Sequence, residues 1–305
     1  MIQKIITPPA LGEGSRVALI APAGLVNREL TEKAAGIMEL WGLNIVRGRY
    51  LYERHGVFAG TDAQRLADLQ WALDDESVDA VICARGGYGV SRIIEGTDFS
   101  SFSRKPKWIV GYSDITVLHL FVNCGYGIKS IHGEMPLNYA AVDTSAESLD
   151  SLKQALFSSI DAYSWGSADA GRGGRAEGLL LGGNLSLISH LAGTGLRDCL
   201  KGKILFIEER GEYMYSFDRM ISGLRLAGVL KGLKGLVVGG LTGLKESPHS
   251  YAMDAGEIIM DAVKDYDYPV AFGFPAGHIP DNRAFYCGAE VKLEVTGRGA
   301  SMKFL

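Results

Sequence analysis

No stretch of the sequence approaches the roughly 20 consecutive apolar residues that a membrane-spanning helix requires. Residues 1–14 also lack an apolar run of signal-peptide length. Blocks of Lys and Arg are missing as well, and the formal net charge is −4. These absences argue against nucleic-acid binding through a basic surface and against attachment to an anionic membrane. We expect a cytoplasmic protein with no nucleic-acid partner and no membrane partner.

Cysteine is scarce, and the four Cys residues are widely separated, with no C-x-x-C pair. This spacing is typical of reduced, buried thiols and not of a disulfide framework or a zinc site. The six His residues form neither an H-x-x-x-H pair nor an H-E-x-x-H motif, so a metal-bound water is not indicated. We expect neither a metal nor a cofactor.

Short apolar runs of strand type alternate with helical patterns in the first half of the chain. Such alternation predicts an α/β fold with a parallel sheet and right-handed crossovers. Thr61 is the expected N-cap of one of the helices. Strands are expected at residues 17–21, 43–46, 78–83, 108–111 and 128–132, and helices at 29–41, 61–73 and 115–122.

The composition changes after residue 160. Residues 161–178 are rich in Gly, Ala and Ser and lack an apolar period, so we expect a linker there between domains at 1–160 and 179–305. The second half reads as mixed α/β. Its end, Arg283–Cys287 followed by Glu290–Val295, is expected to form a hairpin, and Pro280-Asp281-Asn282 before it has residues typical of a turn.

Ser113 is the first candidate for chemistry, because it stands between a strand that stops at Gly111 and a helix that follows. A Ser on a sharp strand-to-helix turn has the geometry of a nucleophile elbow, beside free N–H groups that favour an oxyanion. The common elbow pattern is G-x-S-x-G, and Ile115 replaces its second Gly. The alternative is that Ser113 or Asp114 only caps the helix.

The glycine-rich run Arg85-Gly86-Gly87-Tyr88-Gly89 follows another buried strand. It is suited to cradle a phosphate, to donate a backbone N–H to an oxyanion, or to make a tight turn. Because the carboxyl ends of parallel strands share one edge of a sheet, this run and Ser113 are expected to lie side by side.

Two further candidates stand at strand ends in the second half. Glu208 and Glu209 follow an apolar strand, where one carboxylate can orient a His, although a solvated strand end is the commoner case. His278 follows Gly277 in a loop from which a general base can reach across a cleft, and an exposed loop His is the alternative. His132 is a reserve candidate.

Several of these segments occur in the order found in one family. They are RGGYG at 85–89, GYSDIT at 111–116, Gly-Gly-Asn at 182–184, FIEE at 206–209 and GFPAGH at 273–278. The chain resembles the LD-carboxypeptidases, a family of serine peptidases. The resemblance implies a flavodoxin-like N-terminal domain, a smaller C-terminal domain and a catalytic triad at their junction.

The resemblance also assigns roles to residues. It implies Ser113 as nucleophile, Glu208 as the acidic residue and His278 as base, with oxyanion donors on the backbone of Gly87 and Asp114. Such an enzyme hydrolyses an L,D peptide bond of a murein tetrapeptide and releases a D-amino acid. We expect a homodimer that acts on a small peptide.

Substrate contacts are assigned by chemistry. A peptidase that removes a terminal residue must bind the free carboxylate of its substrate, and an Arg can do so by bidentate pairing. Arg85 is the first candidate for this role. An ion pair that stabilises its own loop is an equally reasonable role for Arg85. Asn184 is a second candidate. Two other functions stay open, namely cleavage of an aminoacyl- or peptidyl-nucleotide amide, as in microcin C immunity peptidases, and non-catalytic binding of a nucleotide or sugar phosphate.

Overall fold

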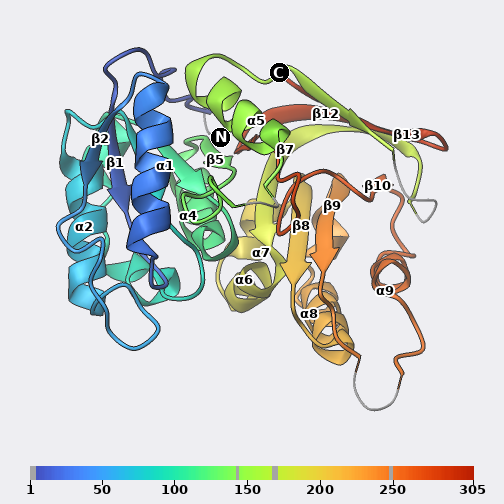
Figure 1. The fold of residues 1–305 in the computed structure, drawn as a ribbon. Helices are drawn as coiled ribbons and strands as arrows, with labels where there is room; N and C mark the ends of the chain where they lie inside the picture. The colour runs from blue at the N-terminus through green and yellow to red at the C-terminus, as the bar shows by residue number, and fades with distance from the viewer. Residues whose placement is uncertain (1–4, 142–143, 167–170, 247–249) are drawn as a thin grey trace. The chain divides into compact units, whose positions relative to one another are not determined.

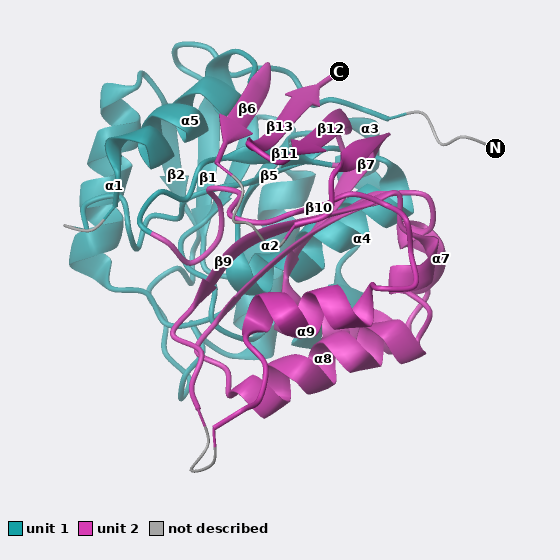
Figure 2. Ribbon diagram, turned by 90° about the vertical axis from the view of Figure 1, so that its right-hand side faces the viewer, with its two compact units in different colours: residues 1–160, 280–287 teal, residues 161–279, 288–305 magenta. Residues whose placement is uncertain are grey.

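The protein is described by a computed structural model that covers residues 5–141, 144–166, 171–246 and 250–305 (Figure 1). The chain divides into two compact units, which Figure 2 shows in separate colours. The first unit comprises 1–160 and 280–287, and the second comprises 161–279 and 288–305. Each unit is built around its own sheet.

The sheet of the first unit has five parallel strands in the order β2-β1-β3-β4-β5, and β11 lies antiparallel beside β5. This parallel order is the flavodoxin-like one, so the expected fold class is confirmed. The strands are β1 (Arg16–Ile20), β2 (Asn44–Arg47), β3 (Ala80–Cys83), β4 (Trp108–Gly111), β5 (Ser130–His132) and β11 (Phe285–Cys287).

Helices pack along this sheet (Figure 1). Every residue of β3 and β4 is buried, as expected for parallel strands that are covered on both faces. The helix after Thr61 begins as predicted, because Thr61 and Gln64 form a capping box. The helices are α1 (Arg28–Leu40), α2 (Asp62–Asp74), α3 (Ser100–Arg104), α4 (Thr116–Tyr126) and α5 (Ala146–Phe157), with short 3-10 turns η1 (Val90–Arg92), η2 (Ile94–Gly96) and η3 (Ser113–Ile115).

The second unit has a seven-stranded mixed sheet in the order β10-β9-β8-β7-β12-β13-β6. Strands β7 to β10 pair in parallel, whereas β12, β13 and β6 add antiparallel partners. The strands are β6 (Ala162–Trp165), β7 (Gly174–Asn184), β8 (Ile204–Arg210), β9 (Gly235–Thr242), β10 (Val270–Ala271), β12 (Glu290–Thr296) and β13 (Gly299–Phe304). The helices are α6 (Leu185–His190), α7 (Leu196–Leu200), α8 (Met214–Leu226) and α9 (Ala255–Ala262), with 3-10 turns η4 (Leu191–Gly193) and η5 (Leu230–Gly232).

The hairpin expected from Arg283–Cys287 and Glu290–Val295 is wrong. Strand β11 pairs with β5 in the first unit, and β12 pairs with β13, which the sequence pattern did not predict. All of β11 is buried, whereas β12 alternates between exposed and buried residues. That alternation suits an antiparallel sheet with one face toward water. Strand β11 is therefore suited to a fully buried position in the first sheet, and β12 to a half-exposed position in the second.

The segment 161–178, expected as a linker, contains β6 and the start of β7, and its residues 167–170 lie outside the described residues. The residues of β6 and of 174–177 are exposed or half-buried. A strand with so little burial carries no apolar alternation, which explains why its sequence reads as irregular.

Cys83 and Cys287 have free, buried thiols, and burial raises the pKa of Cys287 to about 12. Among the described residues, no group of three or more His, Cys, Asp or Glu side chains is arranged to hold a metal ion. In the same part of the chain, no helix is long and apolar enough to cross a membrane.

Candidate active site

Ser113 lies on a strained turn at the carboxyl end of β4. Its φ of 63° is the one positive value among the described residues other than glycine. The left-handed region costs an L-residue about 1–2 kcal/mol, and such strain gathers at functional sites. No side chain caps η3 or α4, so the capping alternative is not what the structure shows. The turn instead leaves the Ser113 side chain half-buried at the sheet edge.

The loop after β3 lies directly against Ser113. A β-carbon built on Gly86 would stand 2.9 Å from the Ser113 Cβ, 3.1 Å from its Oγ and 3.3 Å from the Asp114 nitrogen. Gly86 therefore has no room for a side chain beside the hydroxyl. The next residue, Gly87, has a φ of +104°, a conformation that favours glycine. The expectation that these two loops lie side by side is confirmed.

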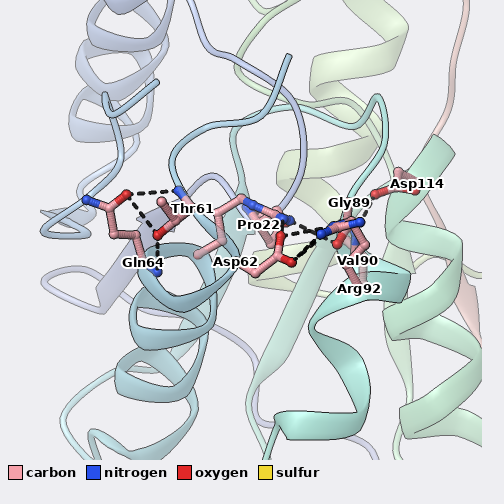
Figure 3. Close-up of polar contacts among 9 residues, drawn as sticks. Pro22, Thr61, Asp62, Gln64, Gly89, Val90, Arg92 and Asp114 are labelled. Atoms are coloured by element: carbon pink, nitrogen blue, oxygen red, sulfur yellow. Dashed lines mark hydrogen bonds and ion pairs between the residues drawn. The ribbon is translucent and has the colours of Figure 1, made fainter. Parts of the chain in front are cut away.

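Asp114 supports the same loop through its side chain (Figure 3). That side chain is fully buried, and Oδ2 accepts a hydrogen bond of 2.9 Å from the Val90 backbone nitrogen. Burial raises the pKa of Asp114 to about 6, although the bond from Val90 and the nearby Arg65 guanidinium act in the opposite direction. At pH 7 and above, the carboxylate is ionised in spite of its burial.

Arg65 is a buried residue of this site that the sequence reasoning missed. Its Nη1 donates to the carbonyl oxygens of Pro22 (2.7 Å) and Gly89 (2.9 Å), and its other terminal nitrogen pairs with Asp62. A signal was present in the sequence, because Arg65 precedes Leu69 by four residues and so lies on the buried face of α2.

In the second unit, Glu208 and His278 form a hydrogen-bonded pair. Glu208 Oε2 lies 2.7 Å from His278 Nδ1 and also accepts from the His278 backbone nitrogen at 3.2 Å. The Glu208 side chain is fully buried, and that of His278 is 15% exposed. A carboxylate at this position accepts the Nδ1 proton, so neutral His278 carries its lone pair on Nε2, as a general base requires.

Gly277 makes this pair possible. Its φ is +107°, and a β-carbon there would lie 2.7 Å from the Glu208 Cβ. The Thr242 hydroxyl donates to the His278 carbonyl at 3.0 Å, which fixes the loop from its other side. A side chain at residue 277 would therefore push His278 away from its carboxylate.

Glu209 serves a different purpose from its neighbour. The pairing register shifts between Ile207, which pairs with Val238, and Glu209, which pairs with Leu241, so β9 has one extra residue opposite the two carboxylates of β8. Glu209 accepts hydrogen bonds from the Ser186 backbone nitrogen (2.8 Å), the Ser186 hydroxyl (2.7 Å) and the Arg210 nitrogen (2.8 Å). Burial raises its pKa. It holds the start of α6, and Glu208 is the carboxylate bonded to the imidazole.

Comparison with known proteins identifies the family. Residues 17–133 match the model of the LD-carboxypeptidase N-terminal domain, and residues 177–293 match that of the C-terminal domain. The chain is 33% identical over 290 residues to the murein tetrapeptide carboxypeptidase of Pseudomonas aeruginosa, an alignment that covers 92% of this chain and 93% of the relative. The chain belongs to the LD-carboxypeptidase family.

Solved structures of similar fold include a muramoyltetrapeptide carboxypeptidase and a microcin immunity protein. The muramoyltetrapeptide carboxypeptidase from Oxalobacter formigenes superposes with a TM-score of 0.85 at 28% identity, covering 95% of this chain and 98% of that one. The microcin C7 self immunity protein MccF, in complex with aspartyl sulfamoyl adenosine, gives a TM-score of 0.84 at 18% identity over 96% and 97% of the two chains. At that identity the second likeness shows a shared fold alone.

The remaining candidates of this LD-carboxypeptidase have partners within their own units. Arg85 Nη1 donates to the Leu25 carbonyl at 2.6 Å. Asn184 accepts from the Leu187 nitrogen at the start of α6 and donates to Glu209 at 3.2 Å. Both side chains are thus held in place by hydrogen bonds.

The reserve candidate His132 is part of the core. Its side chain is fully buried, and its ring stacks on Phe285 with centroids 4.7 Å apart. His119 is buried too, beside the Gly111 carbonyl at 2.8 Å, and burial lowers its pKa to about 4. Both imidazoles are packed in the core, and burial favours the neutral form of His119.

Proposed function

We propose that the protein is a serine carboxypeptidase that hydrolyses an L,D peptide bond in murein tetrapeptide and releases a C-terminal D-amino acid, D-Ala. The observation that carries this proposal is the 33% identity to a murein tetrapeptide carboxypeptidase over 92% of the chain. The strained Ser113 turn and the Glu208–His278 pair supply the local chemistry that such a reaction uses.

The proposed mechanism is acyl transfer. Ser113 attacks the carbonyl carbon of the scissile bond while His278 Nε2 takes the hydroxyl proton. Glu208 holds the imidazole in the tautomer with a proton on Nδ1 and stabilises the imidazolium that forms. The backbone N–H groups of Gly87 and Asp114 receive the oxyanion. His278 then gives its proton to the departing amine, and water cleaves the acyl-enzyme by the reverse steps.

Release of a terminal residue also requires recognition of its free carboxylate. We assign this role to Arg85, whose loop adjoins Ser113, with Asn184 as a second hydrogen-bonding group for the substrate. Arg85→Lys keeps the charge but loses the planar fork. It is expected to raise KM more than it lowers kcat, and an unchanged KM would contradict the assignment.

The direct test is mass spectrometry of a murein tetrapeptide after incubation with the protein. The expected product is lighter by one alanine residue, and released D-Ala is identified by chiral chromatography. A tetrapeptide that ends in L-Ala and the Ser113→Ala variant are the matched controls. An intact tetrapeptide after prolonged incubation with folded protein would refute the proposal.

The same assay distinguishes the alternative function. An immunity-type peptidase would cleave the amide between an aminoacyl or peptidyl group and a nucleotide-like group. An aminoacyl sulfamoyl-adenosine is therefore the second substrate to incubate. Cleavage of this compound with no release of D-Ala would favour the alternative.

We further propose that the enzyme is a cytoplasmic homodimer. Light scattering coupled to gel filtration gives the mass directly, and the chain mass of 32.8 kDa distinguishes a dimer from a monomer. Cell fractionation tests the location. A single-chain mass at assay concentrations would contradict the dimer.

A further inference from the structure

A single peptide unit of the glycine-rich loop is held from both sides by buried charges. The carbonyl oxygen of Gly89 accepts from Arg65 Nη1 at 2.9 Å, and the N–H of Val90 donates to Asp114 Oδ2 at 2.9 Å. These two groups belong to the same peptide bond (Figure 3). Hydrogen bonds to charged groups are about twice as strong as neutral ones.

The same contacts join three loops at the carboxyl ends of β1, β3 and β4. Arg65 Nη1 also donates to the Pro22 carbonyl after β1, at 2.7 Å. Two residues later, the Gly24 nitrogen donates to the Gly86 carbonyl at 3.0 Å. Asp114 belongs to the third loop, directly after Ser113. The bonds thus tie the glycine-rich loop to the Ser113 turn.

The loop is shaped to receive the guanidinium. A β-carbon on Gly89 would lie 2.4 Å from Arg65 Nη1, and φ at Gly89 is +141°. Three of the five residues at 85–89 are glycines, which cost the most backbone entropy to order. A segment of this composition needs outside bonds to hold one conformation.

Burial makes these bonds costly to lose. Both side chains are buried, with relative exposures of 1% for Arg65 and 0% for Asp114. Arg65 also pairs with Asp62, whose side chain is 41% exposed and which binds the exposed Arg92 as well. Removing Arg65 would take its donor from the buried Pro22 carbonyl and leave the Gly89 carbonyl with only the Arg92 backbone N–H, at 3.1 Å.

We propose that Arg65 and Asp114 are positioning residues that fix the Gly89–Val90 peptide and so place the loop carrying the Gly87 N–H beside Ser113. The inference rests on the proposed acyl transfer, because the loop is assigned there as an oxyanion donor. Neither side chain touches the reacting atoms. Both act through the backbone that they hold.

The test uses three single variants, Arg65→Met, Arg65→Lys and Asp114→Asn, together with the double variant R65M/D114N. The matched control is Arg92→Gln, which loses a positive charge and the side-chain bonds to Asp62 but keeps the backbone bond from residue 92 to the Gly89 carbonyl. Circular dichroism and melting establish that each variant is folded. All measurements are made at pH 8, where the Asp114 carboxylate is ionised.

Two readouts report on the loop without any peptide substrate. The first is the rate at which a fluorophosphonate labels Ser113, which depends on the nucleophile and its oxyanion donors. The second is hydrogen exchange of the amides at 85–93. Arg65 contacts the carbonyl of the peptide and not its N–H, so faster exchange of the Val90 amide in Arg65→Met reports motion of the loop itself.

We expect labelling about 100-fold slower in Arg65→Met and in Asp114→Asn, as for a misplacement of about 1 Å in other sites. Exchange of the Val90 amide should be at least about tenfold faster in both. Arg65→Lys should recover part of each loss, because it restores a donor. The double variant should label Ser113 no more than about twofold more slowly than the slower of the two single variants, since both changes release the same peptide unit. Arg92→Gln should stay within about twofold of wild type.

Folded Arg65→Met and Asp114→Asn proteins that label Ser113 at the wild-type rate would overturn the proposal. The proposal would also be overturned if the fold-loss of labelling rate in the double variant equalled the product of the two single losses, because Arg65 and Asp114 would then act independently. If Arg65→Met does not fold, Arg65→Lys and Asp114→Asn decide the question. A wild-type protein that labels Ser113 yet releases no D-amino acid would refute the proposed substrate and leave the positioning result intact.

Discussion

Replacing Glu208 by Gln tests the proposed base with almost no change in volume. Glu208 Oε2 accepts two hydrogen bonds from His278, and its Oε1 is buried with no hydrogen-bond partner among the described residues. A Gln whose oxygen faces His278 keeps both bonds but places an NH2 group where Oε1 lies, without an acceptor. The opposite orientation sets the NH2 group against two donors. Neither orientation of the Gln amide reproduces the hydrogen bonds and the negative charge of the Glu208 carboxylate.

The size of the effect follows from the charge that is removed. The carboxylate stabilises the imidazolium that forms in the transition state, over a separation of charge centres of about 4 Å. With an effective dielectric constant of about 20, that attraction is about 4 kcal/mol. Each 1.4 kcal/mol is about tenfold in rate, so kcat should fall about 10³-fold. KM should change little, because the interaction strengthens only as charge develops.

The assay is release of D-Ala from murein tetrapeptide, with kcat and KM measured for both variants. Glu209→Gln is the matched control, since it is the same substitution one residue along β8. Glu209 holds Ser186 at the start of α6. Its replacement should lower stability by about 1–3 kcal/mol and leave kcat within about tenfold of wild type.

The opposite pattern would refute this reasoning. If folded Glu209→Gln is crippled while Glu208→Gln is nearly normal, the carboxylate bonded to His278 is not the one that assists catalysis. The alignment of FIEE with the family would then have to shift by one residue.

Other predictions follow from the same structure. Ser113→Ala should fold normally and lose turnover by about 10⁵-fold or more, and near-wild-type release of D-Ala would contradict the nucleophile. Prolonged chelation followed by gel filtration should leave activity unchanged, because the proposed steps use side chains, backbone N–H groups and water; a loss that zinc restores would contradict this. Burial raises the pKa of Asp114 from 3.8 to about 6, so the folded state holds this proton more tightly. Its stabilising contribution should be greatest below about pH 4 and fall by about 3 kcal/mol up to pH 6. Urea denaturation from pH 4 to 7 should show this fall in wild type and not in Asp114→Asn.

The local elements were largely predictable from the sequence. Apolar runs marked the buried strands of the first unit, and Thr61 marked the start of α2. The turn at Ser113 was visible because a strand pattern stops at Gly111 and a helical one follows. Its place beside Gly86 followed from the geometry of parallel strands, whose carboxyl ends share one edge.

The errors fall where pairing between distant segments decides the structure. Nothing local distinguishes β11, which pairs with β5, from a first arm of a hairpin with β12. Residues 162–165 and 174–177 are exposed or half-buried, so their strands show no apolar periodicity in the sequence.

The sequence by itself determined which residues have the chemistry for acyl transfer, because hydroxyl, imidazole and carboxylate groups stand at strand ends in a family order. The resemblance assigned Glu208 as the acidic residue, and the tertiary structure shows the hydrogen bond between Glu208 and His278. The tertiary structure also turned Arg65, an ordinary-looking helical residue, into a buried support of the glycine-rich loop. The physical reason is that hydrogen bonds and burial depend on residues far apart in the chain, whereas propensity and periodicity report only on near neighbours.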